Sequence, residues 1–279
     1  MTFEATQKGN PRRITVNQHT FPKASIERFA DSHGFVQIVR TASGQAFKAK
    51  PSKDVFCAPR VWNQQAETGF MREIEDGFQV LANGILSGQM QRVNAAESEL
   101  ITKFYCLWNI RFLRKRYRGA DQKLSENGVS GVSFEYTKDD QECLEIGGIN
   151  VIRPDMTLSS RHLVSISIRQ EVDQTAATMR GFQWQVVVAT DGEFLVPDNF
   201  LQYWAVPLSP TMSMIVTSAK KPQKLSRDQV SAINRIAVES SFEYYFARDP
   251  SKCPVAPLKP ARGHPIKRAT EFLYDLFRK

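Results

Sequence analysis

Two long helical patterns, joined by a short polar connection, constrain this chain more than any other feature. In residues 64–87, apolar side chains recur at spacings of three and four, the period of an amphipathic helix. In residues 95–118 they cover more than half of the helix circumference, which indicates a central helix. Gly88 and Gly119 follow the two patterns, where helices commonly end. Because the connection is short, we expect the two helices to pack antiparallel.

The segments around these helices alternate with the period of β-strands. Residues 35–40 and 46–50 predict a hairpin, since residues 42–45 suit a turn. A polar, turn-rich stretch at 119–155 separates the helices from a second group of strand patterns. These further strands are expected at 163–168, 182–188, 193–196, 203–206 and 212–217, with a rigid turn at 207–210. Short turns between them favour an antiparallel sheet.

A last helix is expected over residues 227–247, begun by a capping box of Ser226 and Gln229. The sequence thus predicts an α+β fold in which antiparallel long helices pack on a mostly antiparallel sheet. We expect a flexible N-terminus at 1–16, a single α+β domain at 17–247 with a sub-boundary at 119–155, and a Pro-rich basic tail at 248–279 with a short helix at 267–277.

Composition excludes several classes of protein. Hydrophobic residues make up 42% and aromatic residues 10%, which supports a packed core and argues against disorder. No run approaches the ~18 apolar residues of a membrane span, and the first residues lack the apolar stretch of a signal peptide. We therefore expect a cytoplasmic protein without a membrane partner. The cysteines, at positions 57, 106, 143 and 253, have neither zinc-site nor disulfide-framework spacing.

The positive charge is unevenly distributed. The net charge is +8, and residues 103–123 carry seven basic side chains against one acidic side chain. Four of them crowd the end of the second helix: Arg114, Lys115, Arg116 and Arg118. They complement the helix dipole or bind a nucleic-acid backbone. The segment 252–279, with seven basic side chains against two acidic ones, could hold an acidic protein partner.

Three charged residues lie on apolar helix faces. Glu67 shares the face of the first apolar stripe, Glu75 lies at its edge, and Arg111 follows the buried stripe of the second helix. A charge on a buried face requires a partner, so we expect a Glu–Arg pair between the two helices. Such a pair fixes helix register, or it lies beneath a cleft where Arg111 binds phosphate.

Two further residues have properties suited to catalysis. His19, followed by Pro22 and a short apolar turn, is either a general acid or base or a residue that fastens the N-terminal segment to the core. Asp198, at the end of a predicted strand, is either a base or metal ligand or a turn residue. The sequence contains no phosphate loop, no GxGxxG, no HExxH and no GxSxG motif.

Taken together, these segments resemble an uncharacterised bacterial family, a domain of unknown function, over residues 17–247. The resembling features are the His19-x-x-Pro22 opening, the hairpin, the Glu-rich helix from Glu67 to Glu75, Arg111 in the second helix, the turn around Asp198, the Pro-Leu-Ser-Pro segment at 207–210 and Asn234 in the closing helix. The Asp198 turn departs from the family pattern, since Pro197 replaces a small hydroxyl residue and Phe200 replaces a proline. The resemblance implies an accessory or defence-type bacterial protein.

Two functional hypotheses follow. The first is a nuclease of toxin or defence type, with His19 as general acid or base, Arg111 binding phosphate, and Glu75 and Asp198 as base or as ligands of a divalent metal. Glu67 is a further catalytic candidate in that site. The alternative is a non-catalytic binding module that holds nucleic acid or an acidic protein through the basic end of the second helix.

Overall fold

The computed structural model describes residues 4–90, 92–124, 136–153, 155–199, 204–217 and 223–257. Its helices are α1 (Lys23–Glu27), α2 (Gln64–Thr68), α3 (Phe70–Leu86), α4 (Ala95–Arg116), α5 (Lys138–Ile146), α6 (Ser160–Thr178) and α7 (Arg227–Ser240). Short 3-10 turns lie at Asp54–Phe56 and Pro250–Lys252. With the strands below, they confirm the predicted α+β class.

The strands form two four-stranded sheets rather than the one sheet expected. The first has the order β11-β7-β10-β9, and only its β11–β7 pair is parallel. Its strands are β7 (Trp184–Ala189), β9 (Ala205–Ser209), β10 (Met212–Val216) and β11 (Gln223–Leu225). The second is antiparallel throughout, with the order β3-β2-β12-β8. Its strands are β2 (Val36–Arg40), β3 (Ala46–Ala49), β8 (Val196–Pro197) and β12 (Tyr244–Ala247).

Two short antiparallel pairs complete the described strands. β1 (Asn17–His19) pairs with β4 (Cys57–Pro59), and β5 (Gln122–Lys123) pairs with β6 (Thr157–Leu158). The first pair brings the N-terminal part of the chain beside the segment that leads into α2. It thereby places His19 next to the helices.

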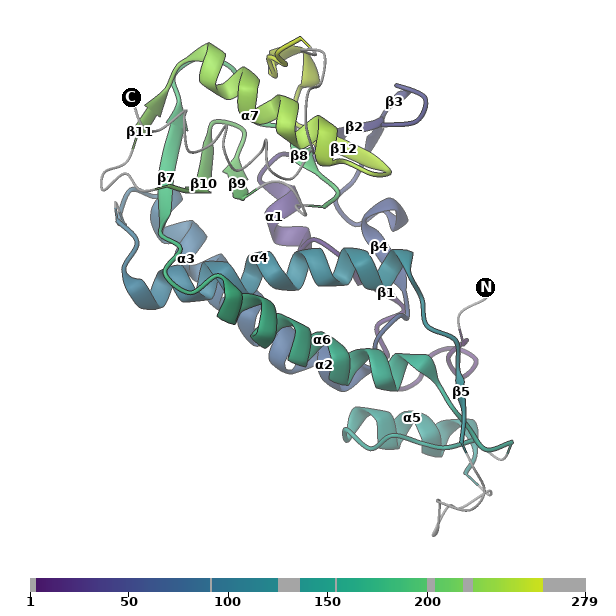
Figure 1. Cartoon of the computed structure of the whole chain (residues 1–279). Coiled ribbons are helices and arrows are strands. Elements are labelled where there is room, and N and C mark those ends of the chain that lie inside the picture. The colour runs from purple at the N-terminus through teal and green to yellow at the C-terminus, as the bar shows by residue number, and fades with distance from the viewer. Residues whose placement is uncertain are drawn as a thin grey trace.

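Helix α4 is the centre of the molecule (Figure 1). It contacts both α3 and α6, and its burial on several sides follows from its apolar circumference. Phe78 of α3 stacks on Phe104 at 3.6 Å between ring centroids, and Met71 lies beside Arg111. Later residues of α3 therefore meet earlier residues of α4, which confirms the predicted antiparallel pair.

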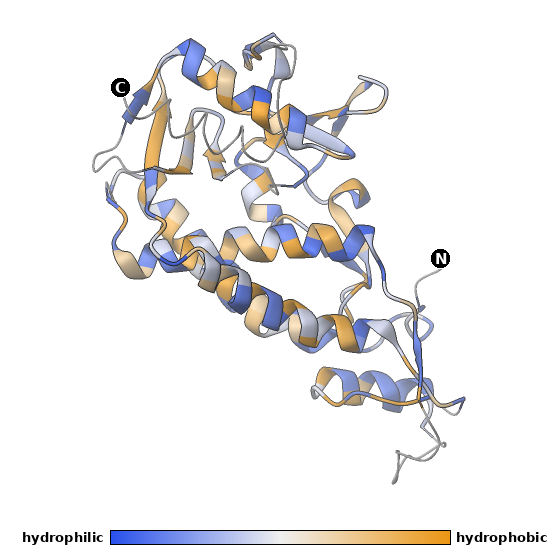
Figure 2. Cartoon of the chain, viewed as in Figure 1, coloured by the Kyte–Doolittle hydropathy of each residue, from blue (hydrophilic) through white to orange (hydrophobic). Residues whose placement is uncertain are grey.

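The C-terminal turn of α4 is polar, and it leads out of the core (Figure 2). Three basic residues occupy this turn, where cations complement the helix dipole. In the described part of the chain, no helix combines the length and the apolarity that crossing a bilayer requires.

The first predicted helix is broken into two. It was expected as one helix over residues 64–87, but Gly69, with φ −98° and ψ −118°, separates α2 from α3. A Cβ atom at Gly69 would lie 2.7 Å from the carbonyl oxygen of Gln65. Glycine is therefore what lets the backbone turn at this point, and the turn places Glu67 on a separate short helix.

The prediction of a strand at 163–168 was wrong, because this segment lies inside α6. Its buried residues recur at helical spacing through Arg161, Val164, Ile168 and Val172. Within six residues an apparent alternation cannot be distinguished from part of a helical stripe.

Other boundaries also differ from the expectation. The closing helix begins at the predicted capping box but ends at Ser240, and Tyr244 belongs to strand β12. The segment 207–210 is not a separate turn, because β9 runs to Ser209. Of the strand expected at 193–196, only Val196 is paired, as the first residue of β8.

The segments expected outside the helices and sheets contain ordered contacts among their described residues. Residues 1–16 were expected to be flexible, yet within residues 4–16 Ile14 is buried and Arg12 pairs with Asp139 of α5. The segment 119–155 contains β5, α5 and β6 among its described residues, and Glu145 of α5 is buried. The helix expected at 267–277 lies outside the described residues.

We predict opposite effects on stability for two glycine substitutions near α3. Gly69→Ala should lower the free energy of unfolding by about 1–3 kcal/mol, because the new Cβ collides with the Gln65 carbonyl. Gly84→Ala is the matched control, since its Cβ would meet only ordinary contacts at 3.8 Å. Inside a helix it should raise that free energy by about 0.5–1 kcal/mol. Urea denaturation followed by circular dichroism measures both. Equal effects of the two substitutions would contradict the role given to Gly69.

Candidate active site

Four of the sequence-predicted site residues come together around Arg111. The guanidinium of Arg111, on α4, forms an ion pair with Glu75 of α3, and its Nη2 lies 3.7 Å from Oε2 of Glu67 on α2. Its Nη1 donates to the backbone carbonyl of His19, on β1, at 3.4 Å. We call these four residues, with Trp62 and Met71, the Arg111 cluster.

Trp62 and Met71 complete the surroundings of the guanidinium. Its Cζ lies 5.3 Å from the centre of the Trp62 ring, within cation–π range, and the indole N–H of Trp62 donates to Glu67. The sulfur of Met71 lies 3.4 Å from Nε and 3.3 Å from Nη2 of Arg111. Arg111 is only 2% exposed. The predicted Glu–Arg pair between the long helices is therefore confirmed, with both glutamates on one guanidinium.

The hydrogen-bond partner of the His19 imidazole determines which ring nitrogen carries the hydrogen. Its Nε2 lies 3.1 Å from the carbonyl oxygen of Pro51, which can only accept a hydrogen bond. In the neutral ring the hydrogen is therefore on Nε2, and Nδ1 is the nitrogen able to take a proton. Burial lowers the pKa of His19, and the bond to Pro51 and the charge of Glu67 oppose this only in part. The neutral, basic form is thus favoured near pH 7.

Glu75 is shifted in the opposite direction. Burial raises the pKa of Glu75, the charge of Arg111 opposes this, and the nearby carboxylate of Glu67 raises the pKa further. Two carboxylates that share one guanidinium repel each other, so the proton is more easily retained. A histidine whose pKa is lowered and a glutamate whose pKa is raised, both in contact with the same arginine, are groups suited to acid–base chemistry.

The carboxylates of the cluster do not fit a divalent metal ion. Both are already opposed by the positive charge of Arg111, which would repel a cation. Among the residues with described positions, no group of three or more His, Cys, Asp or Glu side chains could hold a metal ion. The metal ligands suggested for Glu75 and Asp198 are therefore not brought together.

Asp198 lies apart from the Arg111 cluster and shapes a turn. Its carboxylate accepts hydrogen bonds from the backbone N–H groups of Phe242, Glu243 and Tyr244, at 2.9, 2.5 and 3.2 Å, and from the amide of Asn199 at 2.8 Å. Burial raises the pKa of Asp198, although these hydrogen bonds oppose the shift. Its contacts in the described structure match the turn alternative and not the catalytic one.

The four basic residues at the end of α4 have different surroundings. Arg114 pairs with Glu171 of α6, and Lys115 lies 3.2 Å from Glu243. Arg116 stacks over the ring of Phe242. Arg118 has no ion pair with any described residue. Arg114, Lys115 and Arg116, which were predicted to contact nucleic acid, therefore contact other elements of the fold. Among the described residues, Arg118 is the one of the four without an ion pair or a ring contact.

Sequence reasoning missed a second group of charges, which lies between α5 and α6. Arg60 and Arg161 both pair with Glu145, and all three side chains are buried. No sequence signal could have identified them, because 119–155 was interpreted as a loop region and the start of α6 as a strand. Trp62 and Met71 were likewise missed, since apolar residues carry no mark of an ionic partner.

Comparisons with known proteins identify no relative. The chain matches no family model, and no curated protein and no solved structure matches it. The resemblance to a family of unknown function therefore stays a prediction. The chemistry of the site rests on the geometry of its own residues.

We predict that Glu75 makes the protein less stable as the pH rises. A carboxyl group with a raised pKa in the folded state binds more protons there than when unfolded, so stability falls as the pH rises above the ordinary glutamate pKa of about 4 and through the raised pKa of the folded state. Glu75→Gln removes the titratable carboxyl group, so the free energy of unfolding should decrease less steeply with pH in this variant. Glu73→Gln, an exposed change on the same helix, should leave the slope of the wild type. Urea unfolding at several pH values measures this slope, and an unchanged slope in Glu75→Gln would contradict the burial of its charge.

Proposed function

We propose that this chain is a nuclease, a phosphodiesterase that acts on nucleic acid through the Arg111 cluster. The observation that carries the proposal is the convergence of Glu67, Glu75 and the backbone carbonyl of His19 on one buried guanidinium, from four separate elements of the fold. Groups with pKa values shifted by burial and by specific partners are typical of catalytic sites.

The proposed reaction is hydrolysis by acid–base catalysis without a metal. Nδ1 of His19 takes a proton from a water molecule as its oxygen attacks phosphorus. The bond to the leaving oxygen breaks, and Glu75 donates its proton to that oxygen, which leaves a phosphomonoester and a hydroxyl group. The proton on His19 then returns to Glu75 through solvent.

Arg111 has a positioning role in this proposal. It is almost fully buried and its donors face Glu75, Glu67, Met71 and the His19 carbonyl. It therefore holds the two carboxylates in place and supplies a nearby positive charge, instead of binding phosphate directly as the sequence suggested. Glu67 sets the charge beside Glu75 and His19. Asp198 has no part in this proposal.

The experiment is cleavage of 5′-labelled single-stranded RNA and DNA, with and without EDTA. Wild-type protein should cleave in both conditions, and His19→Ala should reduce kcat by at least about 100-fold. His33→Ala, on an exposed histidine, should cleave like the wild type. A wild-type protein without activity, or a His19→Ala variant that keeps it, would end the nuclease proposal.

The alternative of a non-catalytic nucleic-acid-binding module has one specific observation in its favour: Arg118, at the basic end of α4, forms no ion pair with any residue whose position is described. The binding-module hypothesis requires that the protein binds an unphosphorylated oligonucleotide in a salt-dependent way, and that the His19→Ala variant binds this oligonucleotide equally well. It further requires that Arg118→Gln weakens this binding. Fluorescence anisotropy at 50 and 200 mM salt measures both. Binding that is independent of salt would exclude this function.

A further inference from the structure

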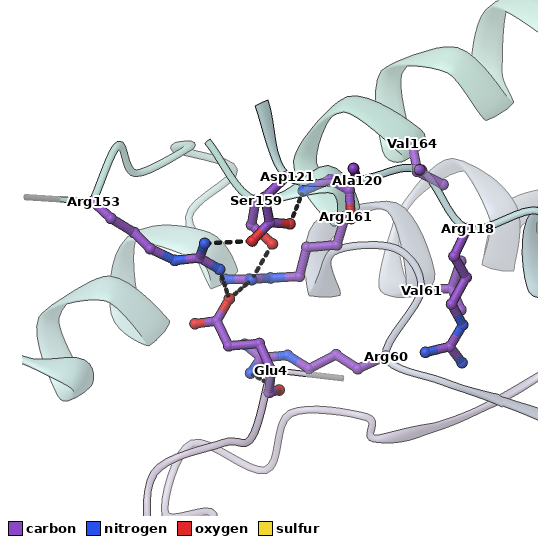
Figure 3. Close-up of a pocket in the computed structure, with 12 residues that line it drawn as sticks. Glu4, Arg60, Val61, Arg118, Ala120, Asp121, Arg153, Ser159, Arg161 and Val164 are labelled. Carbon is purple, nitrogen blue, oxygen red and sulfur yellow. Dashed lines mark hydrogen bonds and ion pairs between the residues drawn. The ribbon is translucent and has the colours of Figure 1, made fainter. Parts of the chain in front are cut away.

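A cavity of about 500 Å³ is lined by none of the residues of the Arg111 cluster and is rich in arginine. It is bordered by the N-terminal segment, the residues after β4, the connection from α4 to β5 and the start of α6 (Figure 3). Its charged lining residues are Glu4, Arg60, Arg118, Asp121, Arg153 and Arg161. We call it the arginine pocket.

Two arginines of the pocket, Arg60 and Arg161, are held in place by ion pairs with the buried Glu145. Nη2 of Arg60 lies 2.8 Å, and Nη2 of Arg161 lies 3.0 Å, from the same Oε2 of Glu145. Burial would raise the pKa of Glu145, but the charges of Arg161 and Arg60 outweigh it and the pKa is lowered. The two guanidinium groups are thus held in one position before any ligand arrives, which lowers the entropic cost of binding.

The pocket already binds one anion, the side chain of Glu4. Its carboxylate forms ion pairs with Arg161, with Lys138 of α5 and, at 2.6 Å, with Arg153. Burial would raise the pKa of Glu4, yet these cations bring it far below its ordinary value. A carboxylate from the N-terminal segment therefore occupies the position in which an external anion would meet the same cations.

Arg118 lines the same pocket but forms no ion pair with Glu4. Figure 3 shows its guanidinium across the pocket from Glu4 and Arg153. No ion pair joins it to any residue that the structure describes, although it is partly buried and burial lowers its pKa. An arginine in this state gains more from an anion than a fully hydrated one does.

The start of α6 adds a fixed positive potential. Ser159 and Ser160 line the pocket at the N-terminus of this 19-residue helix. The backbone N–H of Ser160 donates to Asp121 at 2.9 Å, so an anion is already favoured at this position.

We infer that the arginine pocket binds a mononucleotide-sized ligand that carries a phosphomonoester group, between Arg118 on one side and Arg153 and Arg161 on the other, and that Glu4 must leave Arg153 and Arg161 when the ligand binds. Planar guanidinium groups recognise phosphate oxygens in pairs, and the volume lies in the ordinary range for small-molecule sites. This inference is independent of the proposed nuclease activity, since it involves none of the residues of the Arg111 cluster.

The test is calorimetric titration with adenosine 5′-monophosphate, with adenosine as the uncharged control ligand. Wild-type protein should bind the phosphate compound and not adenosine. Glu4→Gln, which removes the competing carboxylate, should bind it about tenfold more tightly, and Arg118→Gln about tenfold more weakly. Arg116→Gln is the matched control on the same helix end, because Arg116 stacks on Phe242 outside the pocket, and its affinity should be that of the wild type.

Two further measurements distinguish a free mononucleotide from a nucleic-acid strand end as the ligand, and test the inference even if a variant does not fold. If Glu4→Gln does not fold, the ligand should still raise the Tm of the wild type, and it should raise the Tm of Arg118→Gln by less at the same concentration. A 5′-phosphorylated oligonucleotide that binds through Arg118 where its unphosphorylated form does not would identify a strand end as the ligand. Equal binding of the two forms, equal effects of Arg118→Gln and Arg116→Gln, or no binding to wild type and Glu4→Gln would each overturn the inference.

Discussion

The buried guanidinium of Arg111 is the interaction on which the arrangement of the N-terminal half depends. Removing such a group from water costs several kcal/mol, about the amount that well-placed carboxylates return. Glu67 and Glu75 supply these carboxylates, and they come from different helices because Gly69 separates α2 from α3. This one shared charge joins α3 to α4 and contacts the backbone of His19 as well.

The segment between β4 and α3 links this cluster to the arginine pocket. Arg60 lines the pocket, and two residues later the indole of Trp62 donates to Glu67. The backbone N–H of Gln64 donates to Glu145 at 3.1 Å, so the start of α2 is tied to the charges behind the pocket. Two ionic groups thus share one short stretch of backbone. Displacing that stretch would therefore disturb both.

The sequence predicts correctly those helices in which the spacing of apolar residues matches the face that is buried. The α3–α4 pair and its Glu–Arg contact could be predicted because a charge on a long apolar stripe must find a partner. Glu4, Glu145 and Arg161 could not, because each lies in a polar context and meets its partners only through tertiary structure. Asp198 shows the converse error, since a carboxylate beside a strand has the same local sequence whether it binds a metal or three backbone N–H groups.

The anchoring of Glu4 has a consequence for how the pocket responds to ionic strength. Proteins that bind phosphate at an open basic surface lose affinity steeply with salt, because binding releases condensed counterions. In the arginine pocket an entering phosphate replaces a carboxylate that already neutralises Arg153, Arg161 and Lys138. Such an exchange of one anion for another releases few ions. The pocket therefore discriminates by shape and hydrogen bonding under conditions where purely electrostatic attraction has faded.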